Sequence, residues 1–268
     1  MKEIKTPLRY PGGKSRVADM LVGYAPDFDE YREPFLGGGS VFVKMKQKFP
    51  NAKYWVNDLF YDLYCFWGAV KSDKDEVVAI IRSWKGKYEN GKELHKHLCD
   101  KLFTLSPIER AAAFFILNRI TFSGTSCSGG YSQESFDKRF TDTSIDRAEN
   151  VSALLKGVKI TNIDYETLLS EDGENVFIFM DPPYYTATKS ALYGKNGELH
   201  KGFDHERFAD AVKKCKHKWL MTYDDCPYIR GLYKDYDIIP FELMYGMKNT
   251  TKNANMKGRE VIIKNYRR

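Results

Sequence analysis

The amino-acid sequence predicts an α/β fold, in which a sheet of mainly parallel strands carries a helical insertion. Three observations lead to this prediction. Short β-rich runs, each ending at an acidic or turn residue, alternate with helical patterns near both ends of the chain, an order typical of parallel sheets. Residues 68–120 have helical periodicity and few strand signals. The last two β-rich runs have no helix between them, which indicates an antiparallel pair.

The predicted strands follow the β-rich runs. The parallel strands are expected at 30–35, 53–58, 158–164, 176–181 and 218–224. The antiparallel pair that closes the sheet is expected at 237–246 and 259–266. Helical patterns follow the first two strands and return at 203–217 and 226–234.

The insertion divides the chain into three parts. Residues 1–64 and 151–268 are expected to form the sheet domain, and residues 65–150 the inserted, mainly helical unit. Within this unit, 121–144 is rich in Ser, Thr and Gly and indicates an ordered loop.

Composition limits the class of protein. At 268 residues with 43% apolar side chains, the chain can bury a globular core. No apolar run is long enough for a membrane span, and the N-terminus has no signal-peptide core. Five cysteines without a close pair fit a reducing compartment, so a cytoplasmic location is expected. No zinc spacing is present, and no metal is expected. A net charge of +6 and 15% aromatic residues are compatible with a nucleic-acid partner.

Ligands of open α/β sheets bind outside the carboxyl ends of the strands, and three stretches should meet there. The first is EPFLGGGS, 33–40, where a strand leads through glycines into a helix. Gly37 and Gly39 would allow the backbone to approach a ligand closely. The stretch resembles a dinucleotide fingerprint but lacks its last glycine, since Phe42 stands there. A plain glycine turn is therefore the alternative.

The second stretch is YWVND, which ends at Asp58. An acid about 20 residues past the glycines, at the tip of the second strand, is where ribose hydroxyls are bound. Together with the glycines, Asp58 points to a ligand that contains adenosine. Capping of the following helix is an alternative role, and both roles can coexist.

The third stretch is VFIFMDPPYYT, 176–186, in which a buried strand ends at Asp181. Pro182 and Pro183 fix the backbone, so a carboxylate and a free carbonyl oxygen are held in place. This arrangement suits an exocyclic amino group, which has two hydrogens to donate. Tyr184 could stack on the ring that carries the amine.

These motifs and their order resemble the Dam-type DNA adenine-N6 methyltransferases. The resemblance covers nearly the whole chain and rests on RYPGGK at 9–14, EPFLGGGS, DPPY at 181–184, FILNRITFSGTSCSGGYS at 115–132 and the closing GREVIIKNY. It implies a Rossmann-like, seven-stranded methyltransferase sheet with an inserted DNA-recognition domain. It also implies methyl transfer from S-adenosylmethionine to the N6 amine of a flipped-out adenine in double-stranded DNA.

The resemblance assigns roles to individual residues. Asp181, Pro182 and Tyr184 match the catalytic residues that hold and stack the target base. The residues that match cofactor contacts are Tyr10, Lys14, Phe35, Gly37, Gly39, Asp58, Asp164 and Asp181. The loop 185–202 is expected either to close over the flipped base or to be an ordinary solvated loop.

The resemblance also implies DNA contacts in the insertion. Phe122 falls at the family's intercalating aromatic, and the other candidates are Arg9, Arg119, Ser123, Thr125, Ser128 and Tyr131. For Arg119 a salt bridge inside the insertion is the alternative role. Cys127 falls at or near the guanine-reading arginine of GATC-specific members, and a thiol cannot make that bidentate contact. A GATC target is therefore in doubt.

Other functions would share part of this pattern. Cytosine N4 and an RNA amine pose the same chemical problem as adenine N6. A DNA-binding protein with a vestigial cofactor pocket would not need Lys14, Asp58 and DPPY together. A nicotinamide oxidoreductase would leave the prolines and tyrosines of 182–185 unexplained. Because an asymmetric base flip needs no second copy, a monomer is expected.

Overall fold

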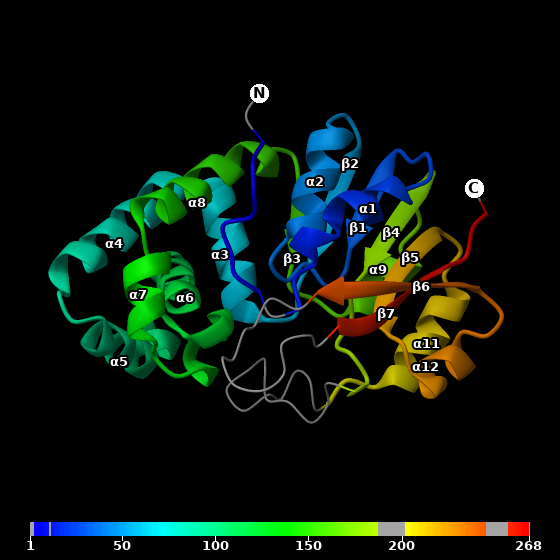
Figure 1. Ribbon diagram of the computed structural model, residues 1–268. Helices are drawn as coiled ribbons and strands as arrows, with labels where there is room; N and C mark the ends of the chain where they lie inside the picture. Colours follow the sequence, from blue (N-terminus) through cyan, green and yellow to red (C-terminus); the bar gives the residue numbers. More distant parts are fainter. Residues whose placement is uncertain (1–2, 11, 187–201, 245–256, 268) are drawn as a thin grey trace.

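The centre of the molecule is a seven-stranded sheet in the order β3-β2-β1-β4-β5-β7-β6 (Figure 1). The computed structural model describes residues 3–10, 12–186, 202–244 and 257–267. The strands are β1 Glu30–Glu33, β2 Lys53–Asn57, β3 Lys159–Thr161, β4 Val176–Met180, β5 Lys218–Asp224, β6 Asp237–Met244 and β7 Lys257–Lys264. The expectation about the loop 185–202 lies almost wholly outside the described residues.

The pairing of the strands confirms the predicted topology. β1 to β5 are parallel to their neighbours, whereas β7 runs antiparallel to both β5 and β6. The order 3-2-1-4-5 is that of a doubly wound Rossmann-like sheet, with its switch point between β1 and β4. The predicted runs are correct to within three residues at each end, and the largest error is at β3, which ends at Thr161.

Helices cover both faces of the sheet. The helices that belong to this domain are α1 Ala18–Gly23, α2 Ser40–Lys48, α9 Tyr165–Ser170, α11 His205–Lys214 and α12 Pro227–Leu232. Alternate residues of β4 show how the faces divide, because side chains along a strand point to opposite sides. Phe177 and Phe179 pack in the cluster that includes α1 and α2, while Ile178 packs in the cluster of α9, α11 and α12.

The chain between β2 and β3 is mainly helical, as predicted, although residues 133–139 and 142–144 of the predicted loop 121–144 are helical as well. Its helices are α3 Tyr61–Ser72, α4 Lys74–Lys87, α5 Gly91–Lys101, α6 Pro107–Ile120, α7 Gln133–Arg139 and α8 Asp142–Leu155. Figure 1 shows α4 to α8 grouped to one side of the sheet. α6 is the central helix, since every residue from Ala111 to Ile120 is buried, and Ser106 and Glu109 begin it with a reciprocal capping box. The exact domain limits of 65 and 150 stay a prediction.

Candidate active site

The glycine turn after β1 has a backbone that only glycine adopts readily. Gly37 and Gly39 have positive φ angles of 49° and 65°. A Cβ atom on Gly39 would lie 2.7 Å from Cζ2 of Trp67, and one on Gly37 would lie 2.9 Å from the ring of Tyr10. The turn is therefore packed closely from both sides, and α2 begins directly after it at Ser40.

Asp58 connects this turn to the end of β2. Its Oδ2 accepts a hydrogen bond from the Gly37 amide at 2.8 Å, and its Oδ1 accepts one from the Phe60 amide at 2.9 Å. Burial raises the pKa of Asp58 to about 6, although the two amide donors act in the opposite direction. Asp58 thus organises the start of α3 locally and also presents a carboxyl group to the cavity beside the glycine turn.

Another part of the cavity lining comes from Phe35, after β1, and from Asp164 and Tyr165, after β3. Asp164 caps α9 by accepting a hydrogen bond from the Glu166 amide at 2.9 Å, and it pairs with Arg207 Nη2 at 3.0 Å. The ring of Phe35 packs against that of Tyr165, with centroids 5.6 Å apart. Phe35 therefore forms an apolar wall, while Asp164 keeps a partly exposed carboxylate at its rim.

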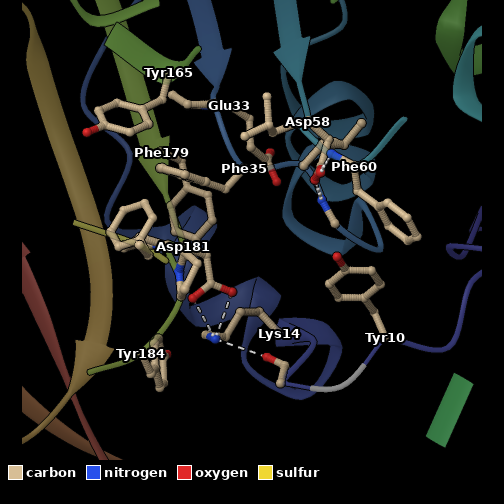
Figure 2. A pocket seen from close by; sticks show the side chains of 18 of the residues that line it. Tyr10, Lys14, Glu33, Phe35, Asp58, Phe60, Tyr165, Phe179, Asp181 and Tyr184 are labelled. Atoms are coloured by element: carbon tan, nitrogen blue, oxygen red, sulfur yellow. Dashed lines mark hydrogen bonds and ion pairs between the residues drawn. The ribbon is translucent and has the colours of Figure 1, made fainter. Parts of the chain in front are cut away.

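The exit of β4 places Asp181 at the centre of a charged cluster (Figure 2). The Nζ atom of Lys14, a residue only 2% exposed, lies 2.8 Å from Oδ1 and 2.9 Å from Oδ2 of Asp181. Lys14 also donates to the Gly12 carbonyl at 3.0 Å. Thr222 on β5 donates a further hydrogen bond to Asp181 Oδ1 at 2.7 Å. Residues 167 positions apart in the sequence thus form one ion pair.

The next two strands on one side of β4, first β5 and then β7, hold the rest of this exit, and the sequence analysis missed their contribution. Asp224 on β5 accepts hydrogen bonds from the backbone amides of Tyr185 and Thr186, at 3.0 and 2.9 Å. Glu260 on β7 accepts a hydrogen bond from the Tyr184 hydroxyl at 2.7 Å. These acids lie in runs that signalled only strands, so nothing local to them could have shown this role.

The structure brings the predicted catalytic and cofactor residues into one cavity of about 750 Å³. It lies at the carboxyl ends of the parallel strands, where ligands of such sheets bind. The predicted residues that line it are Tyr10, Lys14, Phe35, Gly37, Gly39, Asp58, Asp164, Asp181, Pro182 and Tyr184. Their individual roles stay predictions, but their convergence is a feature of the structure.

The predicted DNA-contacting residues differ in exposure: Phe122 is exposed, Arg119 is buried, and Arg9, Ser123, Thr125 and Tyr131 are partly exposed. Phe122 is 61% exposed, so its ring is accessible to a partner. It begins a loop that also contains Ser123, Thr125 and Ser128 and returns at Tyr131, where an isolated bridge pairs Tyr131 with Thr121.

The two arginines lie further inside. Arg119 is 5% exposed, donates a hydrogen bond to the Pro7 carbonyl and has its guanidinium 5.5 Å from the ring centroid of Phe115. Burial, with neighbouring arginines, lowers the pKa of Arg119 to about 9. Arg9 donates to the carbonyls of Arg119 and Thr121, at 3.4 Å each. These contacts assign to both arginines a role in holding the N-terminal segment against the insertion, and Arg119 offers almost no surface to DNA.

The fold and the cavity define the class of protein to which the chain belongs. It is a protein with a Rossmann-like sheet, in which the glycine turn, the second-strand acid and the DPPY exit face one ligand site. Comparison with known sequences identifies the family. A family model described as D12 class N6 adenine-specific DNA methyltransferase matches residues 10–247, so the chain belongs to that family.

Individual relatives agree with this assignment. The chain is 24% identical to the type II methyltransferase M1.LlaDCHI of Lactococcus lactis subsp. cremoris, over 96% of this chain and 94% of that protein. It is 26% identical to the type II methyltransferase M.MjaIII of Methanocaldococcus jannaschii, over 71% and 73%. It is 25% identical to a DNA adenine methylase of Vibrio cholerae, over 98% and 95%. The predicted family, reaction and enzyme class are therefore confirmed: this is an adenine-N6 DNA methyltransferase.

No described helix combines the length and apolar composition that a membrane crossing requires. No group of three or more His, Cys, Asp or Glu side chains in the described ranges is arranged to hold a metal ion.

Proposed function

We propose that the chain methylates a flipped-out adenine in double-stranded DNA, with S-adenosylmethionine as methyl donor and Asp181, Pro182 and Tyr184 as the catalytic residues. One observation carries the proposal. The carboxylate at the end of β4 opens into the same cavity as the glycine turn and the second-strand acid. An amine-binding group and an adenosine-binding group therefore share one site.

The cavity fits the proposed methyl donor. Asp58 would accept hydrogen bonds from the ribose hydroxyls, and the glycine turn would allow close approach of the methionine portion. Phe35 and Ile163 offer apolar surface for the adenine ring, with Asp164 at its edge. Bound there, S-adenosylmethionine would supply a methyl group on a positively charged sulfur.

Asp181 has one acceptor position left for the target amine. A carboxylate offers about four lone-pair positions. Among the described contacts, Thr222 donates a hydrogen bond to Oδ1 and Lys14 donates one to Oδ2, while Lys14 Nζ also lies 2.8 Å from Oδ1 as an ion pair. A position on Oδ2 remains, and the Pro182 carbonyl supplies the second acceptor that the two amine hydrogens need.

These two acceptors address the weakness of the nucleophile. The lone pair of the adenine amine is delocalised into the ring, so the nitrogen is a poor nucleophile. Hydrogen bonds to Asp181 and Pro182 favour a pyramidal nitrogen with its lone pair directed at the methyl group. Alignment of this kind can contribute about 7–11 kcal/mol to catalysis. The proton that the product nitrogen sheds goes to Asp181 or to water.

The target base must leave the duplex to reach this cavity, at a cost of a few kcal/mol. Stacking on Tyr184 would recover roughly 1–3 kcal/mol of that cost. Phe122, with its exposed ring, would fill or wedge the stack next to the target, and Ser123, Thr125, Ser128 and Tyr131 would contact the DNA around it. We further propose that the enzyme acts as a cytoplasmic monomer. Because Cys127 stands at or near the position of the guanine-reading arginine, we expect its target sequence to differ from GATC.

The test is incubation with S-adenosylmethionine and mixed-sequence duplex DNA, followed by digestion to nucleosides and mass spectrometry. N6-methyldeoxyadenosine is expected, and Asp181→Ala should abolish it while DNA affinity stays within a few-fold. The matched control is Asp225→Asn, which lines the same cavity but pairs with Arg230 at 2.5 Å. Turnover by Asp181→Ala would refute the catalytic role of Asp181, and methylated deoxycytidine would refute the assignment of adenine as the target base.

A further inference from the structure

Glu260 on β7 is a buried carboxylate that has no role in the chemistry described so far. It is 1% exposed and lies opposite Asp224 in the pairing of β5 with β7. A buried charge weakens a fold unless it is paired and hydrogen-bonded, and an apolar side chain in its place is often better for stability. The side chains that Glu260 contacts therefore indicate its role.

Two contacts of Glu260 with described residues lead to the proposed target-base pocket. Its Oε2 accepts the hydrogen bond of the Tyr184 hydroxyl at 2.7 Å and lies 3.8 Å from Lys14 Nζ. The same Nζ atom is 4.9 Å from the centroid of the Tyr184 ring. Carboxylate, ring and ammonium thus form one cluster against Asp181, in the region where Figure 2 shows Lys14, Asp181 and Tyr184 together.

The first consequence concerns the orientation of Tyr184. Its ring stacks on that of Tyr223, with centroids 5.8 Å apart and planes 26° apart. The hydrogen bond to Glu260 fixes the far end of the same ring. A ring that is already held loses little conformational freedom when a base stacks on it, so stacking becomes more favourable.

The second consequence concerns Lys14. Its ammonium is shared between Asp181, at 2.8 Å, and Glu260, at 3.8 Å. In the described part of the chain these are the carboxylates that pair with it. Without the charge of Glu260, Lys14 would be bound more strongly by Asp181 alone, and it would compete with the target amine for Asp181 Oδ2.

We propose that Glu260 is a positioning residue for methyl transfer, which orients Tyr184 for stacking and shares Lys14 so that Asp181 stays open to the target amine. This inference rests on the proposed roles of Asp181 and Tyr184. If so, the antiparallel strand β7, which neighbours β5, takes a direct part in shaping the base pocket.

The test compares Glu260→Gln with wild type in steady-state kinetics and in S-adenosylmethionine binding by calorimetry. Glutamine keeps an acceptor for the Tyr184 hydroxyl but removes the charge. We expect kcat to fall by about tenfold or more, the size of effect that loss of a charged contact produces, while the Kd for S-adenosylmethionine stays within about threefold. Asp237→Asn is the matched control, since Asp237 on β6 pairs with Lys264 on β7 at 2.6 Å, and its kcat should not change. A Glu260→Gln enzyme with wild-type kcat would overturn the proposal.

A double-mutant cycle tests the Tyr184 contact without any activity. Glu260→Ala and Tyr184→Phe should each lower the midpoint of thermal unfolding, and the double variant should lose less than the two effects combined, because either change already breaks the bond. Strictly additive losses would overturn the proposed contact. If the wild-type enzyme methylates no DNA, the proposed function is refuted. The double-mutant cycle would still decide whether Glu260 and Tyr184 are in contact.

Discussion

The affinity for S-adenosylmethionine should fall as the pH falls through about 6, because of Asp58. Burial raises the pKa of this carboxyl to about 6 from its ordinary value of 3.8. In the free protein the group is therefore ionised above pH 6 and neutral below it. Ribose hydroxyls donate best to the ionised form, so binding below pH 6 must release a proton.

The size of the effect follows from the pKa. If only the carboxylate binds well, the apparent Kd is multiplied by one plus the ratio of neutral to ionised Asp58. With a pKa of about 6, that factor is roughly 11 at pH 5 and roughly 1.1 at pH 7. Asp58→Asn, which has no ionisable group, should bind about 10–100-fold more weakly at pH 8 and show no such dependence.

Isothermal titration calorimetry between pH 5 and pH 8 measures both quantities. Titrations in buffers of different ionisation enthalpy should give close to one proton released per ligand at pH 5 and close to none at pH 8. Asp164→Asn is the control, because its carboxylate lines the same cavity at the rim, and it should keep the pH dependence. A Kd that does not vary with pH in wild type, or that varies equally in Asp58→Asn, would refute the assignment of Asp58 to the ribose.

Three other changes have expected outcomes that follow from single contacts. Thr222→Val removes the 2.7 Å hydrogen bond to Asp181, so kcat should fall by about tenfold with the Kd for S-adenosylmethionine unchanged; an unaltered kcat would show that Thr222 does not orient the carboxylate. Phe122→Ala removes a ring that is 61% exposed, so it should leave the free energy of unfolding within about 0.5 kcal/mol and weaken DNA binding by roughly 1–3 kcal/mol in a fluorescence anisotropy assay; equal affinity would move Phe122 out of the DNA interface. Gly39→Ala would place a Cβ 2.7 Å from Trp67 at a φ of 65°, so the free energy of unfolding, measured by chemical denaturation, should fall by about 1–3 kcal/mol. Wild-type stability would mean that the turn readily adopts another conformation.

Much of the sheet could be predicted because its signals are local. Most of the strands are short runs rich in β-branched, aromatic or other apolar residues, and such a run can be recognised without knowing its neighbours. β1, with the sequence Glu-Tyr-Arg-Glu, is the exception. The ends of the strands were less certain, as β3 shows, because hydrogen bonding to a partner decides where a strand stops. The insertion was recognised by its helical periodicity, but the sequence could not show that α6 is its buried centre.

The site divides in the same way. Asp58 and the glycines could be identified from their spacing, since a strand, a turn and a helix of ordinary length bring them to one edge of the sheet. The sequence left Arg119 between a contact with DNA and a salt bridge inside the insertion, and the structure buries it against the Pro7 carbonyl. An arginine has the same sequence signature in either place, because its long side chain can reach a phosphate or an interior carbonyl.

The sequence by itself therefore determined the fold class, through the alternation of strand and helix patterns along the chain. It also determined the glycine turn, the second-strand acid and the rigid exit at Asp181, since each of these is written in fewer than a dozen consecutive residues. Only the tertiary structure decided that Lys14 pairs with Asp181 and that Thr222 and Glu260 complete the site. These contacts join segments up to 167 residues apart. They form only when parallel and antiparallel strands take their order in the sheet, because that order sets which side chains become neighbours.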